Sequence, residues 1–171
     1  DAPALAVGGA VALVGGADLV MHDSVISGNS TTFAGGALFA MGANDFSGGL
    51  VDAGSFEITD SSFTANHIDQ NGEDPSSPGQ GVAILTYGPG GNITRSVFSN
   101  NVINDAPPEP AFIEGLRGAL EFILADLPIN FVSSEISGNT IALRPGVYSE
   151  GAGVYCYGGA TPLTITNTTI S

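Results

Sequence analysis

The chain alternates apolar and small polar residues in short runs, and these runs return at a regular interval. Four nine-residue segments align without a gap, and Ile165–Ser171 begins a fifth copy. Their first residues lie 34 to 38 positions apart; the four complete segments are Met21–Asn29, Ile58–Asn66, Ile93–Asn101 and Phe131–Asn139. Alternation with a period of two is typical of strands with one buried face. The sequence therefore predicts stacked β repeats.

A glycine-containing element precedes each copy. It occurs at Gly8–Val11, Gly35–Leu38, Gly81–Ile84, Gly118–Leu120 and Gly153–Tyr155. Its last glycine lies 20 or 21 residues before the terminal asparagine in the first, third and fourth copies, but 30 before it in the second. The second copy therefore carries an insertion of ten residues near Asp45 to Ser55.

Each copy is predicted to contain three strands whose inward faces stack into one column, because no single copy can bury its own apolar face. The second strands direct these side chains inward: Leu19 and Met21, Phe56 and Ile58, Ile129 and Phe131, Leu163 and Ile165. The third strands direct inward Ile26, Phe63, Phe98, Ile136 and Ile170. For the first strands we expect Leu13, Ala40, Leu85, Phe122 and Tyr157 inward, and Ala12, Phe39, Ile84, Glu121 and Cys156 outward. The outward file is so apolar that we expect a loop, a short helix or a neighbouring chain to cover it, although Glu121 should face solvent.

Equivalent polar residues should form files through the stack, with about 4.8 Å between neighbouring strands. One file contains Ser24, Ser61, Ser96, Ser134 and Thr168, and the other Asn29, Asn66, Asn101 and Asn139. An asparagine ladder passes amide hydrogen bonds from repeat to repeat and satisfies turn backbone that is otherwise buried unpaired. The expected role of these asparagines is structural.

These motifs resemble a known family. The GGAV and GGAL elements, followed by Phe63-Thr-Ala-Asn66 and Phe98-Ser-Asn-Asn101, look like the GGAI and FxxN repeats of chlamydial polymorphic outer-membrane proteins. The resemblance implies an all-β, right-handed parallel β-helix of about four and a half coils. It also implies a secreted passenger that acts as an adhesin or surface structure. Ile26 and Ile136 replace the phenylalanine of FxxN, which conserves an apolar residue.

Variable stretches separate the copies at His67–Gln80, Val102–Arg117 and Thr140–Ala152. The second one predicts a short helix at 111–117, followed by a strand at 119–124. In the first, Asp69, Glu73 and Asp74 are weak Ca²⁺ candidates, and a solvated acidic loop is the simpler interpretation. Tyr148, Tyr155 and Tyr157 form either an aromatic strip that grips a sugar or partner protein, or part of the core.

Charge narrows the classes of partner. The 171 residues include 3 arginines and no lysine, against 17 Asp and Glu residues, which gives a formal net charge of −14. Nucleic acids and anionic membrane surfaces are repelled by such a chain. No apolar run is long enough for a membrane helix, and no signal-peptide pattern opens the sequence. Cys156 has no partner cysteine for a disulfide within the chain.

Three sequons start at Asn29, Asn92 and Asn167, although about two are expected by chance in a chain of this composition. Asn92 and Asn167 are the glycosylation candidates, because the ladder makes Asn29 a poor acceptor.

Catalysis has one candidate constellation. Asp23, Asp60 and Arg95 occupy the same position in successive copies. Two carboxylates and a cation on one face suit glycan hydrolysis or lysis, whereas the simpler interpretation is a surface ion pair between Asp60 and Arg95. We therefore expect no catalytic residue, no cofactor and no resident metal.

The sequence as a whole predicts one domain spanning 1–171, a segment of a longer solenoid that is secreted or at the cell surface. Its expected partners are other copies or extracellular proteins, through its ends and loops, and glycans. Strand edges without a recognisable cap should make the isolated chain oligomerise. The alternative function is a carbohydrate-active enzyme that acts on extracellular glycans.

Overall fold

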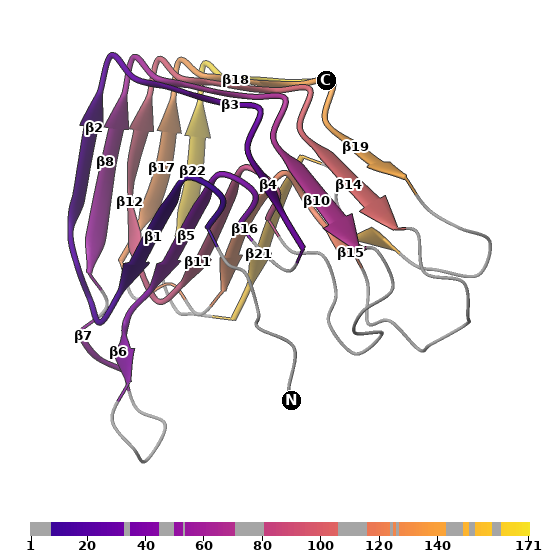
Figure 1. Ribbon diagram of the computed structural model, residues 1–171. Coiled ribbons are helices and arrows are strands. Elements are labelled where there is room, and N and C mark those ends of the chain that lie inside the picture. The colour runs from indigo at the N-terminus through magenta and orange to yellow at the C-terminus, as the bar shows by residue number, and fades with distance from the viewer. Residues whose placement is uncertain are drawn as a thin grey trace, which may run out of the picture.

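The computed structural model describes residues 8–32, 35–44, 50–52, 54–70, 81–105, 116–123, 125, 127–142, 149–150, 153–158 and 162–171. These residues form an all-β structure without a helix. Each repeat contributes one strand to each of several parallel sheets, and the sheets lie around a common interior (Figure 1). The arrangement is compatible with a parallel β-helix.

Four parallel sheets account for most of the described strands. Sheet I contains β1 (Val11–Val14), β5 (Leu38–Met41), β11 (Ile84–Tyr87), β16 (Leu120–Ile123) and β21 (Val154–Tyr157). Sheet II contains β2 (Leu19–His22), β8 (Ser55–Thr59), β12 (Gly90–Thr94), β17 (Ile129–Val132) and β22 (Leu163–Thr166). Sheet III contains β3 (Val25–Ser27), β9 (Ser62–Thr64), β13 (Val97–Ser99), β18 (Glu135–Ser137) and β23 (Thr169–Ile170). Sheet IV contains β4 (Ser30–Thr31), β10 (His67–Gln70), β14 (Val102–Asp105) and β19 (Thr140–Ala142).

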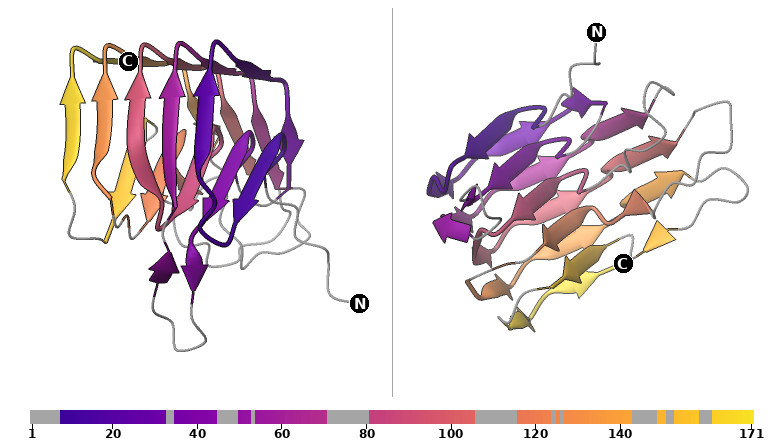
Figure 2. Two further views of the ribbon diagram at one scale, coloured as in Figure 1. Left: turned by 90° about the vertical axis from the view of Figure 1, so that its left-hand side faces the viewer. Right: turned by 90° about the horizontal axis from the view of Figure 1, so that it is seen from below.

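Two smaller pairs lie outside these sheets. β15 (Leu116–Arg117) pairs in parallel with β20 (Ser149–Glu150). β6 (Ala43–Asn44) pairs antiparallel with β7 (Leu50–Asp52), and this hairpin projects beyond the ends of β2 and β8 (Figures 1 and 2). It accounts for the insertion predicted in the second copy.

The interior is a column of side chains from sheets I, II and III. The predicted inward positions of sheets II and III are buried in the central repeats, including Ile58, Phe63, Phe98 and Phe131 at 0% exposure. Phe63 and Phe98 stack with ring centroids 5.0 Å apart. Leu163, Ile165 and Ile170 occupy the same files in the last repeat and are exposed.

The predicted alternation of sheet I is wrong in two repeats. The register aligns Leu13, Ala40, Thr86, Phe122 and Cys156 in one file, and Ala12, Phe39, Leu85, Glu121 and Tyr155 in the next. Thr86, not Leu85, shares the inward file with Phe122, and Cys156 takes the place predicted for Tyr157. Hydrophobicity misplaced this strand because Thr86 is a buried polar residue, whose hydroxyl donates to the Pro89 carbonyl oxygen at 3.2 Å.

Glu121 is fully buried, which contradicts the expectation that it faces solvent. It lies in the outward file between Leu85 and Tyr155. Phe39, Leu85 and Ile123 on the same face form a second buried cluster, against which Met41 and Tyr87 pack. The outer face of sheet I is therefore covered at its centre, as its apolar composition predicts.

Sheet IV was not predicted. Its strands occupy the beginnings of the stretches assigned to variable loops, and an apolar residue follows two positions after three of the ladder asparagines. Ile68 and Ile103 are fully buried and, with Val82 and Ala119, form a separate cluster that Ile141 packs against. The predicted helix at 111–117 is wrong at Leu116 and Arg117, which form β15, and residues 111–115 lie outside the described residues. The predicted strand at 119–124 is confirmed over Leu120–Ile123, which form β16, and Leu124 lies outside the described residues.

The two turns of each repeat share one backbone conformation. Asp23, Asp60, Arg95, Ser133 and Asn167 all have φ between 47° and 52°, and Gly28, Ala65, Asn100 and Gly138 between 53° and 66°. A left-handed residue followed by serine joins sheet II to sheet III, and one followed by asparagine joins sheet III to sheet IV. In both turns, the polar residue that follows the left-handed residue forms hydrogen bonds to the neighbouring repeat.

Candidate functional site

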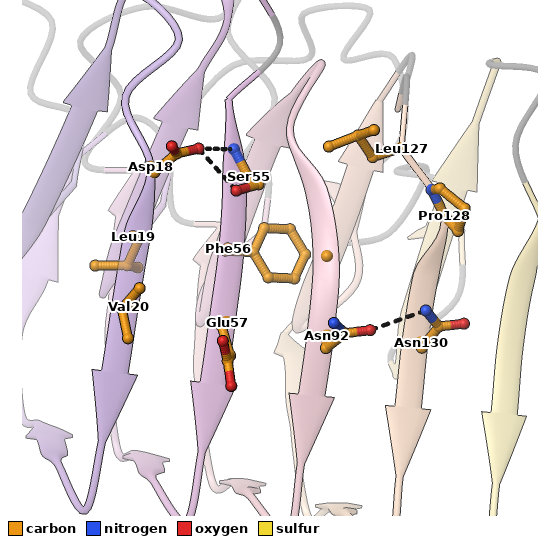
Figure 3. Close-up of a pocket in the computed structure, with 11 residues that line it drawn as sticks. Asp18, Leu19, Val20, Ser55, Phe56, Glu57, Asn92, Leu127, Pro128 and Asn130 are labelled. Atoms are coloured by element: carbon orange, nitrogen blue, oxygen red, sulfur yellow. Dashed lines mark hydrogen bonds between the residues drawn. The ribbon is translucent and has the colours of Figure 1, made fainter.

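A groove of about 400 Å³ lies on the outer face of sheet II (Figure 3). It runs across the first halves of β2, β8, β12 and β17, next to the ends from which the β6–β7 hairpin projects. Its lining consists of Asp18, Leu19, Val20, Ser55, Phe56, Glu57, Gly91, Asn92, Leu127, Pro128 and Asn130. Within the described part of the chain, this is the candidate functional site.

Parallel register brings the polar groups of the groove together. Val20, Glu57, Asn92 and Asn130 are Cα partners across the four strands, at outward positions of the alternating pattern. The Asn130 side-chain amide Nδ2 donates to Asn92 Oδ1 at 2.9 Å. These residues lie more than thirty positions apart in sequence and become neighbours only through stacking.

The rim next to the hairpin is held by hydrogen bonds. Asp18 Oδ1 accepts from the Ser55 backbone N–H at 2.8 Å and from the Ser55 hydroxyl at 2.7 Å. Asp18 precedes β2 and Ser55 opens β8, so the carboxylate joins the first repeat to the second at the strand ends. The side chain of Asp18 is thereby oriented beside the groove (Figure 3).

A glycine shapes the floor. Gly91 is the Cα partner of Phe56 and Ile129, so it has no side chain where neighbouring repeats direct an apolar one inward. An ideal Cβ on Gly91, at φ +154°, lies 1.9 Å from the Phe56 backbone oxygen. Figure 3 shows the ring of Phe56 directed toward β12, with Leu127 and Pro128 above it. The floor is therefore apolar and the rim polar.

This groove was not predicted from the sequence. Its signals are the Gly90-Gly91 pair, which interrupts the apolar alternation of the third repeat, and Glu57 at an outward strand position. These two features indicate a site only once the register is known to align Glu57 with Asn92 and Asn130.

The predicted catalytic constellation resolves into an ion pair. Arg95 Nε donates to Asp60 Oδ1 at 2.7 Å, and Arg95 Nη2 pairs with Asp60 Oδ2, so the contact is bidentate. The hydrogen bond from Arg95 holds the pKa of Asp60 below its ordinary value, and the same bond raises the pKa of Arg95. Asp23 occupies the same turn position one repeat away. Asp60 and Arg95 thus satisfy each other on the surface, apart from the groove lining.

The four ladder asparagines form a continuous hydrogen-bonded file. Each Oδ1 from Asn66 onward accepts from the backbone N–H and side-chain Nδ2 of the preceding asparagine, at 2.9 to 3.1 Å. From the second asparagine onward, Nδ2 also donates to a backbone carbonyl oxygen of the preceding repeat; the acceptors are Ile26, Phe63 and Phe98 in order. The file therefore satisfies buried turn backbone, which is a structural role.

The serine file works similarly at the other turn. From Ser61 onward, each hydroxyl oxygen accepts from the backbone N–H of the preceding file member at 3.2 to 3.3 Å. It also donates to the carbonyl oxygen two residues earlier in its own repeat.

The weak Ca²⁺ candidates are only partly described. Asp69 Oδ1 accepts from Asn104 Nδ2 at 2.9 Å, and Asp69 Oδ2 from the Ser30 hydroxyl at 3.2 Å. Glu73 and Asp74 lie outside the described residues. Among the residues that the structure describes, no group of three His, Cys, Asp or Glu side chains is placed to hold a metal.

The three sequon asparagines differ in how their side chains are engaged. Asn92 and Asn167 are exposed. The Nδ2 of Asn29 donates to Ser27 O at 3.3 Å and to Asn66 Oδ1 at 3.0 Å. The ladder therefore occupies the atom that glycosylation modifies, as expected for Asn29.

The tyrosines and the cysteine lie at the last strand of sheet I. Tyr155 and Tyr157 are on the outward face and Tyr157 is exposed, whereas Tyr148 lies outside the described residues. Cys156 was predicted on the covered outward face. It is instead in the inward file with Phe122 and is exposed, since among the described strands β21 is the last in sheet I. Packing around its sulfur raises the pKa of the thiol.

Comparison with protein-family models, curated proteins and solved structures finds no match for this chain. The resemblance to chlamydial polymorphic outer-membrane repeats thus has no family model or relative behind it. No helix in the described ranges is long and apolar enough to cross a membrane.

Proposed function

We propose that this chain is a right-handed parallel β-helix that serves as a secreted or cell-surface scaffold, structural or adhesive rather than catalytic. The observation that carries the proposal is that its repeated polar residues form hydrogen bonds to one another. The asparagine and serine files bond repeat to repeat, and Asp60 is held by Arg95. Residues that recur at every repeat therefore build the stack.

Three arguments support the handedness and the location. Crossover connections between parallel strands of one sheet are right-handed in nearly all proteins, because of the right-handed twist of strands. The formal net charge of −14 favours solubility and disfavours nucleic acids and anionic membranes as partners. The repeat motifs resemble those of surface passengers, whose partners would be other copies, extracellular proteins or glycans reached through loops and ends.

Protease treatment of intact producing cells tests the location. Proteinase K is the suitable reagent because the chain has three arginines and no lysine, so trypsin has few sites. We expect cleavage or release from intact cells, while a cytoplasmic marker stays whole. Protection of the chain until the cells are lysed would exclude a surface location.

A carbohydrate-active enzyme is the second candidate, and one observation favours it. Asp18 and Glu57 both line the groove on sheet II, and paired carboxylates are what glycoside hydrolysis requires. The assay is release of reducing ends or unsaturated sugars from neutral and acidic polysaccharides. We expect none; release that is abolished by Glu57→Gln would replace the scaffold proposal with an enzyme.

A further inference from the structure

The groove on sheet II has the chemistry of a saccharide site. We infer that it binds one unit of a neutral glycan, with the rim formed by Asp18, Glu57, Asn92 and Asn130 and the floor by Phe56, Leu127 and Pro128. The inference rests on the proposed function as a scaffold that makes extracellular contacts, and it names the class of ligand.

Charge excludes acidic glycans. The described lining residues include two carboxylates, Asp18 and Glu57, and no lysine, arginine or histidine. A uronate or sulfated sugar would be repelled by this rim and by the net charge of the chain. A neutral or cationic ligand remains.

The pattern of donors and acceptors selects the neutral one. The bond between the two asparagines uses Asn130 Nδ2 and Asn92 Oδ1, which leaves the Asn92 amide as a donor and Asn130 Oδ1 as an acceptor within the described residues. With Glu57 as a further acceptor, the rim presents both kinds of group side by side. Sugar hydroxyls donate and accept, whereas the ammonium or guanidinium of a basic peptide only donates.

The floor suits the apolar face of a sugar ring. Leu127 is 41% exposed, and Pro128 and Val20 are also exposed, so apolar surface lies beside the polar rim. Sites for small ligands combine such surface with a few placed polar groups. Because the rim residues stand on hydrogen-bonded strands and Asp18 is fixed by Ser55, little ordering is needed on binding.

The test measures binding of defined oligosaccharides to the full chain made in a bacterial host, so that the Asn92 sequon carries no glycan. The probes are neutral oligomers of glucose, galactose, mannose, xylose and N-acetylglucosamine, an oligogalacturonate, and a basic peptide. Calorimetry gives the affinity, and amide chemical shifts of the labelled protein locate the contact. We expect a neutral oligomer to bind and to shift the amides of Glu57, Asn92 and Asn130.

Variants decide whether the groove is the site. Glu57→Gln and Asn130→Ala should each weaken binding by at least about tenfold, because the first replaces a charged acceptor oxygen with a donor amide and the second removes the side-chain acceptor. The matched control is Glu135→Gln, an exposed strand carboxylate on the outer face of sheet III, which should bind as the parent does. Thermal unfolding of each variant checks that the stack is intact.

Three results would overturn the inference: no neutral oligomer binds, only the uronate or the basic peptide binds, or all variants bind equally. None of these contradicts a non-catalytic scaffold. Conversely, cleavage of a bound oligosaccharide would refute the scaffold proposal while leaving the binding site in place. The two failures are therefore distinguishable.

Discussion

The Oδ1 atom of Asn101 accepts two hydrogen bonds from Asn66, one from its backbone N–H at 3.0 Å and one from its side-chain Nδ2 at 2.9 Å. Both asparagines are fully buried. One side chain therefore satisfies the turn of the neighbouring repeat, and the same geometry recurs between successive asparagines along the file. The ladder links repeats whose loops differ in length.

Replacing Asn101 by alanine should destabilise the protein by about 2–4 kcal/mol, because several buried groups lose their partners at once. These include the Asn66 backbone N–H and the Phe63 carbonyl oxygen. Urea unfolding measures the change. The control Asn92→Ala removes an exposed strand asparagine and should change stability by no more than about 0.5 kcal/mol. Equal effects of the two substitutions would contradict a structural ladder.

Phe98→Ala should lower the free energy of unfolding by about 3–5 kcal/mol, because it leaves a cavity next to Phe63 in the central column. The ring is fully buried, so solvent does not replace the contacts that the substitution removes. Val25→Ala, at a side chain that is 73% exposed, is the control and should be close to neutral. Denaturant unfolding reports both, and a mild loss for Phe98→Ala would mean that the column is loosely packed.

Gly91→Ala should be far more harmful than Gly15→Ala. Both glycines have positive φ, +154° and +77°. At Gly15 a Cβ meets no heavy atom within 4 Å, so only the backbone preference is lost, about 1–2 kcal/mol. At Gly91 the Cβ collides with the Phe56 backbone oxygen, and shifting β12 should add at least about 2 kcal/mol. Thermal unfolding of the pair measures the difference, and comparable losses would show that β12 does not approach β8 so closely.

The ion pair should shift the titration of Asp60. Because the hydrogen bond from Arg95 lowers the pKa of the folded carboxyl, its contribution to stability is present above the unfolded value of about 3.9 and is lost as pH falls through the lower folded pKa. Carboxyl NMR titration should find this pKa low in the parent and raised in Arg95→Gln. High salt should narrow the difference, since both side chains are exposed. An unchanged Asp60 pKa in Arg95→Gln would show that the pair does not persist in solution.

The Cys156 thiol should alkylate more slowly than an unfolded thiol at neutral pH, although it is exposed. Although the residue is exposed, neighbouring atoms partly bury its sulfur, and this burial raises the pKa of the thiol. Less of the reactive thiolate is therefore present than in a thiol with the ordinary pKa of about 8.5. The measurement is the rate of iodoacetamide reaction against pH, in buffer and in urea. A midpoint in buffer at or below that in urea would contradict the raised pKa.

Sheets II and III could largely be predicted because apolar and small polar residues alternate in most of their strands, with Gly91 as the interruption in sheet II, and because their turns repeat a serine or threonine and an asparagine. Sheet I was harder. Its third strand places Thr86 inward and Leu85 outward, and both are fully buried, Leu85 in the second apolar cluster. Hydrophobic alternation does not predict a buried Thr86, because it takes no account of hydrogen bonds. The hydroxyl of Thr86 donates to a nearby carbonyl oxygen, and a polar group satisfied in this way is accommodated in the interior.

By itself the sequence determined the repeat length, the insertion in the second repeat, the two polar files and most of the central column, because each depends on residue types that recur at one spacing. The tertiary structure alone decided which side chains meet across repeats. Glu57, Asn92 and Asn130 belong to three different repeats and share no motif. In the sequence, Gly91 only interrupts the apolar alternation, and the reason for a glycine there is the close approach of the Phe56 backbone. Whether Glu121 is buried was likewise decided by the packing on the outer face of sheet I. Local sequence patterns indicate which residues of one strand face inward, whereas the residues of a groove become neighbours only through the register between strands.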